Sequence, residues 1–442
     1  MIQVTPGSAA RHRRPPGSCA RLGATSVAGA PLTLDRPPLQ APCLAPGLPS
    51  PPVCGKGVRS VRIAQLAPLY VPVPPTRYGG TERVVSVLAD ELARRGHDVT
   101  LFASGGSETL ARLHPVIPRP IWESEVSDPI AWHAYEVLEA VRMSDQFDVI
   151  HAHLDYMPWL AGAQFRAPVV TTLHGRLDLP ELRPLFAASA GQALISISDM
   201  QRKPLADLDL NWRATVHHGL NLSLTFDLGP GDGGYVLFLG RMSPEKDPAT
   251  AIRAAIDAGI PMKLAGPIHP VNQRYFDSEV RPLLEHPDVE WVGEADDRQK
   301  NELLGGAIAL VAPQAWDEPF GLMFIESLAC GTPVITQPRG AAPEIIEAGV
   351  DGFLCADRRA MTKACLVAGE IDRERCRSRA LRRFSTARMV DDYERVYRGL
   401  VAEWAEPAAV TMPVPAQSVF QGVEVRAIAG KPPALEPTGQ SS

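Results

Sequence analysis

Two carboxylates flank a glycine turn in the stretch EPFGLMFIESLACGTPVI, which begins at Glu318. Glu318 and Glu326 are separated by a segment that contains Phe320, Gly321 and Leu322. A carboxylate can accept hydrogen bonds from two neighbouring hydroxyl groups, and free N–H groups at the start of a helix bind anions. If a helix begins near Phe320, the stretch predicts recognition of sugar hydroxyls around a cradle of amides. The alternative is a helix cap followed by a surface glutamate.

Two cations follow an expected strand end in FLGRMSPEKD. Arg241 comes directly after Gly240, and Lys246 lies in the loop that follows. Cations placed together at the end of a buried strand can neutralise a diphosphate leaving group. The alternative is that both side chains are ordinary solvated surface charges.

A pair of glycines precedes a helical pattern in YGGTERVV. Gly79 and Gly80 allow a close approach of the backbone, and Thr81 is expected to cap the helix that follows. The unpaired N–H groups and the positive end of the helix dipole predict an anion site there. Two glycines before a helix can also form only a tight turn.

Histidines stand at the ends of several expected strands. His151 and His153 alternate along one strand, so both point to the same side of its sheet. His174 precedes a glycine, which leaves its ring accessible, and we expect it to contact a ligand. His153 is a second candidate, for which a packed and hydrogen-bonded role is the alternative. His217 and His218 are interpreted as residues that line a hinge.

The sequence contains no pattern typical of a transition-metal site, because neither HExxH nor CxxC occurs. One Asp-x-Asp pair, Asp207 and Asp209, could hold a divalent ion on a diphosphate. It follows a helix-like stretch instead of ending a strand, so we interpret it as a solvated loop. Neither a metal nor another cofactor is therefore expected.

Composition excludes several classes of partner. The chain has 442 residues, a net charge of -6 and 45% hydrophobic residues. No basic platform for nucleic acid is present, and no run approaches the roughly 20 apolar residues of a membrane span. Cysteines number seven, an odd count that argues against a complete disulfide framework and favours reduced thiols in the cytoplasm. Nothing in the pattern predicts an oligomeric state.

Apolar runs alternate with helical patterns along the chain, and a Gly/Asp-rich break, DLGPGDGG, divides them into two sets. Such runs, without strict alternation, predict parallel sheets that are covered on both faces. The expected strands lie at 62–69, 98–104, 148–154, 168–175, 193–198 and 214–219 before the break, and at 235–240, 261–266, 289–294, 309–314, 333–338 and 352–355 after it. The predicted fold class is α/β, with two Rossmann-like doubly wound domains that face each other across a cleft.

The domain boundaries follow from this pattern. A Pro- and Arg-rich extension, 1–58, is predicted to be disordered, with a transit peptide or a misassigned start codon as alternatives. The N-terminal, acceptor-side domain spans 59–228, and the C-terminal, donor-binding domain spans 229–386. A helix at 387–404 is expected to pack back on the first domain, and a disordered tail occupies 405–442.

The order of these motifs resembles the retaining glycosyltransferases of family 4, which have the GT-B fold. The resemblance covers about residues 61 to 400 and rests on GRMSPEK, the Glu-x7-Glu segment and ACGTPVI in sequence order. More narrowly, APLYVPVPPTRYGGTERVV, HAHLDYMPW, TTLHGRLDLPEL, SISDMQR and KNELLGGA resemble the subgroup that includes the avilamycin-pathway glycosyltransferase and a tetrahydrobiopterin glucosyltransferase.

The resemblance implies a role for each matching residue. Arg241 and Lys246 would bind the donor diphosphate, and Glu326 the ribose hydroxyls. Glu318 would bind hydroxyls of the transferred sugar, and His174 would lie beside its C6 hydroxyl. The remaining donor contacts would come from Gly80 and from the amides of Phe320, Gly321 and Leu322. One departure is Asp247, where relatives commonly carry Gly, and it would either weaken donor binding or cap the next helix.

The function expected from this resemblance is a retaining, metal-independent glycosyltransferase that uses a UDP-sugar, with UDP-glucose favoured, and an unidentified hydroxyl acceptor. The acceptor side would include His153, Tyr156 and Tyr78, with Trp159 as a further stacking face or as a core residue. A sugar-nucleotide epimerase or a phosphorylase could share this architecture, and a non-catalytic sugar-nucleotide-binding protein is the third alternative.

Overall fold

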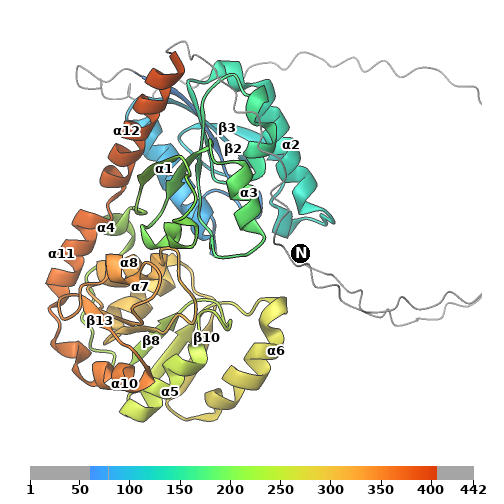
Figure 1. Ribbon diagram of the computed structural model, residues 1–442. Helices are drawn as coiled ribbons and strands as arrows, with labels where there is room; N and C mark the ends of the chain where they lie inside the picture. The colour runs from blue at the N-terminus through green and yellow to red at the C-terminus, as the bar shows by residue number, and fades with distance from the viewer. Residues whose placement is uncertain (1–59, 78, 406–442) are drawn as a thin grey trace, which may run out of the picture. The chain divides into compact units, whose positions relative to one another are not determined.

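The computed structural model describes residues 60–77 and 79–405 (Figure 1). The segments predicted to be disordered, 1–58 and 405–442, lie outside the described residues apart from Ala405, and so does Tyr78.

A parallel sheet occupies the first half of the described chain. Its seven strands have the order β3-β2-β1-β4-β5-β6-β7, so the strand order reverses next to β1. The strands are β1 (Arg62–Leu66), β2 (Asp98–Ser104), β3 (Arg112–Ile117), β4 (Val149–Ala152), β5 (Val169–Thr172), β6 (Ala193–Ser196) and β7 (Trp212–Thr215). Ligands of doubly wound sheets bind at the carboxyl ends of the strands beside such a reversal.

Strand β3 was not predicted from the sequence. It contains Pro115 and only two buried residues, Val116 and Ile117, so it lacks the apolar run of the other strands. Its position at the edge of the sheet explains why it can include proline, which cannot donate to a neighbouring strand.

Helix α1 (Gly80–Arg94) follows β1 and starts at the edge of the sheet where ligands are expected. Val84, Leu88 and Leu92 form its buried face, as the apolar spacing predicts. Its N-cap is Gly79, which has no side chain that could cap the helix. The prediction that Thr81 caps α1 is wrong, because this residue already lies in the first turn.

Further helices of this half cover the sheet or connect its strands. They are α2 (Pro129–Arg142), α3 (Leu182–Ala188), α4 (Leu222–Thr225) and the short helical segments η1 (Ile121–Glu123), η2 (Ser144–Gln146), η3 (Met157–Gln164) and η4 (Met200–Leu205).

A second parallel sheet, of six strands, follows within the described residues and contains all the strands predicted after the break. Its order is β10-β9-β8-β11-β12-β13. The strands are β8 (Val236–Leu239), β9 (Met262–Ala265), β10 (Val289–Gly293), β11 (Leu310–Ala312), β12 (Val334–Thr336) and β13 (Gly352–Leu354). The two doubly wound sheets confirm the predicted fold class.

Helices pack on the second sheet in the same way (Figure 1). They are α5 (Pro248–Ala258), α6 (Gln273–Tyr275), α7 (Asp297–Gly306), α8 (Leu322–Ala329), α9 (Ala342–Ile345), α10 (Arg358–Val367) and α11 (Arg373–Arg383), with η5 (Pro270–Asn272), η6 (Phe276–Val280), η7 (Arg281–Glu285) and η8 (Ala368–Glu370) between them. The described helices include none that is long and apolar enough to cross a membrane.

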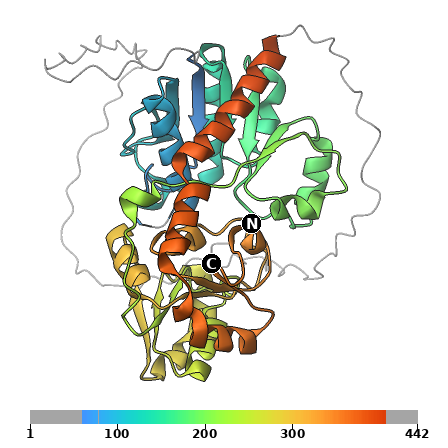
Figure 2. The same cartoon turned by 90° about the vertical axis from the view of Figure 1, so that its left-hand side faces the viewer.

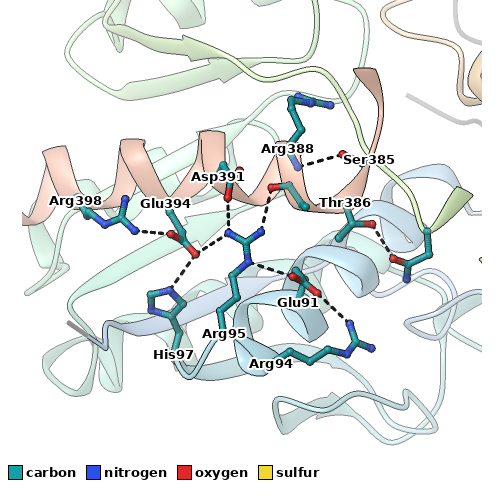
Figure 3. A network of polar contacts seen from close by, with 12 residues as sticks. Glu91, Arg94, Arg95, His97, Ser385, Thr386, Arg388, Asp391, Glu394 and Arg398 are labelled. Carbon is teal, nitrogen blue, oxygen red and sulfur yellow. Dashed lines mark hydrogen bonds and ion pairs between the residues drawn. The ribbon is translucent and has the colours of Figure 1, made fainter. Parts of the chain in front are cut away.

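The last helix, α12 (Thr386–Ala405), returns to the first sheet and packs beside α1 (Figure 2). Its buried face includes Tyr393 and Tyr397, which are 0% and 1% exposed. At the end of α1, the Arg95 guanidinium forms ion pairs with two carboxylates of α12, at 2.6 Å from Asp391 and 3.1 Å from Glu394 (Figure 3). Apolar packing and these ion pairs together fix α12 on the first half of the chain.

Candidate active site

A cavity of about 320 Å³ lies between the carboxyl ends of the two sheets. Both halves of the described chain line it. All nine residues that the sequence assigned to catalysis or donor binding are among its lining residues: Gly80, His174, Arg241, Lys246, Glu318, Phe320, Gly321, Leu322 and Glu326.

Lys246 and Glu318 form an ion pair on one wall of the cavity. Trp316 braces this pair: its indole Nε1 donates to the Glu318 carboxylate at 3.2 Å, and Lys246 Nζ lies 5.3 Å from the ring centroid. Gly340 packs directly against the Glu318 backbone, and only glycine fits there, because a Cβ at this position would lie 2.4 Å from the Glu318 backbone nitrogen. The carboxylate is therefore fixed in place before any ligand binds.

Arg241 follows β8 at the edge of the same cavity. Gly266 permits this turn, since it has φ +147° and a Cβ there would lie 1.9 Å from the Gly240 carbonyl oxygen. Among the described residues, nothing accepts a hydrogen bond from the buried Nε of Arg241. An unpaired buried donor is costly, so this nitrogen is a prepared contact for an anion.

Glu326 is held by a lysine that sequence reasoning did not identify. Lys300 Nζ, from α7, lies 2.9 Å from Glu326 and 2.9 Å from Asp297. Asp297 in turn lies 2.6 Å from Arg83 of α1, so the chain of charges links the two halves. No local signal marks Lys300 as a partner of Glu326, because only the packing of α7 beside α8 brings them together.

Helix α8 starts beside these groups, and Gly321, Leu322 and Met323 at its start line the cavity. Gly321, its N-cap, has φ +87°, and a Cβ there would lie 2.7 Å from the Phe324 ring. A Cβ on Gly80 would meet Leu322 at 3.6 Å, an ordinary contact. Gly79 tolerates a side chain less well than Gly80 does, because it has φ +151° and a Cβ there would lie 2.7 Å from Pro75. The two helix starts thus approach each other across the cavity.

Two histidines line the cavity from the first half. His174 stacks on His218 with ring centroids 5.2 Å apart, and His218 packs edge-on against Phe320 at 4.8 Å. Burial lowers the pKa of His174 to about 3, so its ring is neutral at physiological pH. His218, interpreted from the sequence as a hinge residue, also lines the cavity, and His217 joins the halves by a 2.9 Å contact with Glu344.

His153 lies behind His174 and does not line the cavity. It is 3% exposed, and its Nδ1 lies 2.8 Å from His174 Nε2. The structure therefore favours the packed, hydrogen-bonded alternative for His153.

Tyr156 and Trp159, the other acceptor-side candidates that the structure describes, lie outside this cavity. Tyr156 is 37% exposed and is not among the cavity's lining residues. Trp159 is a core residue, since it is 7% exposed, donates to Thr171 Oγ1 at 3.0 Å and packs on Phe186. Tyr78 is not among the described residues.

Asp207, of the Asp-x-Asp pair, and Asp247 have local partners. Asp207 forms an ion pair with Arg183, away from the cavity. Asp247 is the N-cap of α5 and accepts a hydrogen bond from the Thr250 N–H at 3.1 Å. In residues 60–77 and 79–405, no group of three or more His, Cys, Asp or Glu side chains is placed to hold a metal ion.

Two family models match the chain. The model described as Glycosyltransferase Family 4 matches residues 78–224, and Glycosyl transferases group 1 matches residues 226–379. The D-inositol 3-phosphate glycosyltransferase of Mycolicibacterium smegmatis is 28% identical over 390 residues, which cover 75% of this chain and 89% of that protein. The phosphatidyl-myo-inositol mannosyltransferase of Mycobacterium leprae is 25% identical over 373 residues, covering 76% and 96%.

Solved structures share the fold. A glycosyltransferase involved in avilamycin A biosynthesis superposes with a TM-score of 0.58 at 23% identity, over 78% of this chain and 98% of that one. Sucrose-phosphate synthase from Thermosynechococcus elongatus superposes with a TM-score of 0.66 at 20% identity, over 78% of this chain and 100% of that one. Anabaena HepE, in complex with UDP and glucose, superposes with a TM-score of 0.62 at 17% identity, over 77% of this chain and 100% of that one.

Proposed function

This chain belongs to the family 4 glycosyltransferases and has their GT-B fold, and from this premise we propose that it transfers a sugar from a nucleoside-diphosphate sugar to a hydroxyl acceptor with retention of configuration. UDP-glucose is the favoured donor. The choice is supported by the structural relative that was solved with UDP and glucose. A mannosyltransferase among the sequence relatives makes GDP-mannose the second donor to test.

The observation that carries the proposal is the charge arrangement of the cavity. Within the part of the chain that the structure describes, the buried Nε of Arg241 has no hydrogen-bond partner, and Lys246 lines the same cavity beside the start of α8. Two cations and a helix N-terminus form a strong site for a diphosphate, whose charge increases as the sugar departs. In this proposal, Glu326 accepts hydrogen bonds from the ribose hydroxyls and Glu318 from hydroxyls of the transferred sugar.

In the proposed reaction, the bond between the sugar's anomeric carbon and the β-phosphate oxygen breaks, and the acceptor oxygen forms a bond to the same face of that carbon. The departing phosphate oxygen takes the proton of the acceptor hydroxyl, so no covalent nucleophile is required. Arg241 and Lys246 stabilise the diphosphate as it leaves. Glu318 orients the sugar, and Lys246 then pairs with phosphate instead of with Glu318 alone.

We propose that no metal takes part, because Arg241, Lys246 and the helix dipoles supply the positive charge that a divalent ion would otherwise provide. Activity should then persist in EDTA, and complete loss with chelator would contradict this part. A cytoplasmic location is supported by the buried free thiols of Cys330, Cys355, Cys365 and Cys376.

The test is a nucleotide-release screen with UDP-glucose and with GDP-mannose across small alcohols, pterins and sugars. We expect release of UDP that depends on an acceptor, with an unchanged anomeric configuration of the product by NMR. Lys246→Met should lower kcat by about two orders of magnitude or more, while Lys263→Met, on β9 and outside the cavity, should not.

Each rival function has its own outcome. Conversion of the donor without an acceptor would indicate an epimerase, and a requirement for inorganic phosphate would indicate a phosphorylase. Donor binding without turnover, with every acceptor, would indicate a non-catalytic binding protein.

A further inference from the structure

A continuous chain of buried polar side chains runs from the cavity to the last helix. We propose that Gln65 and Tyr397 are positioning residues that fix the tautomer of His174, so that its ring offers a bare Nδ1 to a sugar hydroxyl. The inference rests on the proposed function, since it concerns the sugar side of that site. Neither Gln65 nor Tyr397 lines the cavity.

The distances make one unbroken series. His174 Nε2 lies 2.8 Å from His153 Nδ1, and His153 Nε2 lies 2.9 Å from Gln65 Oε1. Gln65 Nε2 donates to the Tyr397 hydroxyl at 3.0 Å, and this hydroxyl lies 2.7 Å from His151 Nδ1. Gln65 and His151 are both 0% exposed and Tyr397 is 1% exposed.

The direction of each hydrogen bond follows from the Gln65 amide. Its Oε1 can only accept, so His153 must carry its proton on Nε2. Burial lowers the pKa of His153 well below its ordinary value, so the ring is neutral and its Nδ1 is bare. His174 must then donate from Nε2 to that nitrogen. Because His174 is also neutral, its remaining nitrogen, Nδ1, can only accept.

Tyr397 holds the amide in this orientation. Its oxygen accepts from Gln65 Nε2, and its own proton is available to His151 Nδ1 at 2.7 Å. With the amide reversed, every donor in the series would become an acceptor, and His174 would present N–H at Nδ1 instead. A change at Tyr397 can therefore reach His174 in the cavity, although Gln65 and His153 lie between them.

The series also explains why α12 returns to the first sheet. Tyr397 follows the entire donor-binding half in sequence, yet its hydroxyl lies within the first half, beside β1 and β4. Thr172 Oγ1 lies 2.7 Å from His151 Nε2 and 3.2 Å from the Tyr393 hydroxyl. Tyr393 thus ends the series on the side away from His174.

This position makes Tyr393→Phe a matched control for Tyr397→Phe. Both variants remove one buried hydroxyl from the same helix, and the two side chains are 0% and 1% exposed. Of these two hydroxyls, that of Tyr397 accepts a hydrogen bond from Gln65, whereas that of Tyr393 contacts Thr172. A purely structural effect of losing a hydroxyl should appear in both variants, whereas an effect on the His174 tautomer should appear in Tyr397→Phe alone.

The first experiment reads the tautomer directly, in the ligand-free full chain with 15N-labelled histidine. The His174 signal is assigned by its absence in His174→Asn. We expect a proton on Nε2 in the wild type and in Tyr393→Phe, and a mixture of tautomers in Tyr397→Phe and Gln65→Met. A proton on Nδ1 in the wild type, or an unchanged tautomer in Tyr397→Phe, would overturn the inference whether or not the protein transfers sugar.

The second experiment measures acceptor-dependent UDP release with UDP-glucose and with UDP-xylose, which lacks the C6 hydroxymethyl group. Tyr397→Phe should lower kcat with UDP-glucose by about tenfold, the effect of one hydrogen bond in the transition state. The rate with UDP-xylose should stay near that of the wild type. Equal losses with both donors would reject the positioning role, while absence of turnover in the wild type would reject only the proposed function.

Discussion

The ammonium nitrogen of Lys300 lies 2.9 Å from the carboxylate of Glu326, and both side chains are nearly buried, with 10% and 6% exposure. A buried carboxylate needs such a partner, because an uncompensated charge in the protein interior is strongly destabilising. Lys300 therefore holds the Glu326 carboxylate in a fixed orientation. Its role is to prepare the carboxylate that would bind the ribose.

Replacing this lysine should weaken nucleotide binding. In Lys300→Met, Glu326 loses its nearest cation and repels the donor diphosphate. We expect the Kd for UDP to rise by about tenfold, which corresponds to about 1.4 kcal/mol. Isothermal titration calorimetry with UDP measures this change without any acceptor. Arg298→Met is the matched control, since Arg298 lies on the same helix but is 76% exposed and pairs with Glu302. An unchanged Kd in Lys300→Met would show that Glu326 needs no positioning.

A second prediction concerns stability and pH. Glu82, in the first turn of α1, is 6% exposed, and burial raises the pKa of its carboxyl from 4.5 to about 7. A carboxyl with a raised pKa favours folding while it is protonated, so this contribution is complete below about pH 4.5 and is lost as the pH rises through about 7. The difference is about 3 kcal/mol at about 1.4 kcal/mol per pKa unit.

Glu82→Gln should remove this pH dependence, because the amide stays neutral. We expect the variant to unfold at a higher temperature than the wild type at pH 8 and at a similar temperature at pH 5. Thermal unfolding at both pH values checks this. Glu108→Gln, at an exposed site of the same half, should leave the difference unchanged. A variant that is less stable than the wild type at pH 8 would mean that the ionised carboxylate stabilises the fold.

The sequence predicted the sheets better than it predicted the contacts between them. Buried strands carry their own signal, so only the edge strand β3, with its proline, was missed. The donor-site residues were found because each follows a strand or starts a helix. Lys300 and Gln65 were not found, since their partners lie 26 and 332 residues away and no local pattern connects them.

The histidines illustrate the same limit. The period of two correctly placed His151, on β4, and His153, just after β4, on one side of the sheet, where their ring centroids lie 4.1 Å apart. It could not tell which element covers that side. Because α12 packs there, His151 contacts Tyr397 instead of a ligand. Contacts of this kind depend on where the chain returns, and the apolar pattern of a helix does not specify its partner.

A third prediction separates the two interpretations of Asp247. This residue has φ +51°, and its carboxylate caps α5 through the Thr250 N–H at 3.1 Å. Asp247→Ala should lower the free energy of unfolding by roughly 1–2 kcal/mol. The variant loses the helix cap, and alanine tolerates the left-handed conformation less well than aspartate or asparagine does. Asp247→Asn, which retains both properties, should unfold like the wild type in a thermal melt.

The same asparagine variant tests whether the carboxylate weakens donor binding. If capping is the main role of Asp247, the Kd for UDP should not change in Asp247→Asn. Tighter binding by several fold would instead indicate that the charge repels the diphosphate.

The last prediction concerns Arg373 of α11, whose guanidinium connects the linker between the sheets to the donor-binding half. It donates to the carbonyl oxygens of Gly229, Gly305, Ala307 and Cys330 at 2.9–3.2 Å and to Thr332 Oγ1 at 2.7 Å. Lysine cannot reproduce this planar fork of donors.

Arg373→Lys should therefore leave several buried carbonyl groups unpaired and lower the free energy of unfolding by roughly 3 kcal/mol. Arg375→Lys, an exposed site on the same helix, should change it by less than about 0.5 kcal/mol. Denaturant titration that follows tryptophan fluorescence measures both. The carbonyl oxygens come from the linker, from α7 and its end, and from the turn after α8. If Arg373→Lys is less stable but the folded protein binds UDP normally, this cluster supports the fold without shaping the donor site. A fully stable Arg373→Lys variant would mean that other donors satisfy these carbonyl groups.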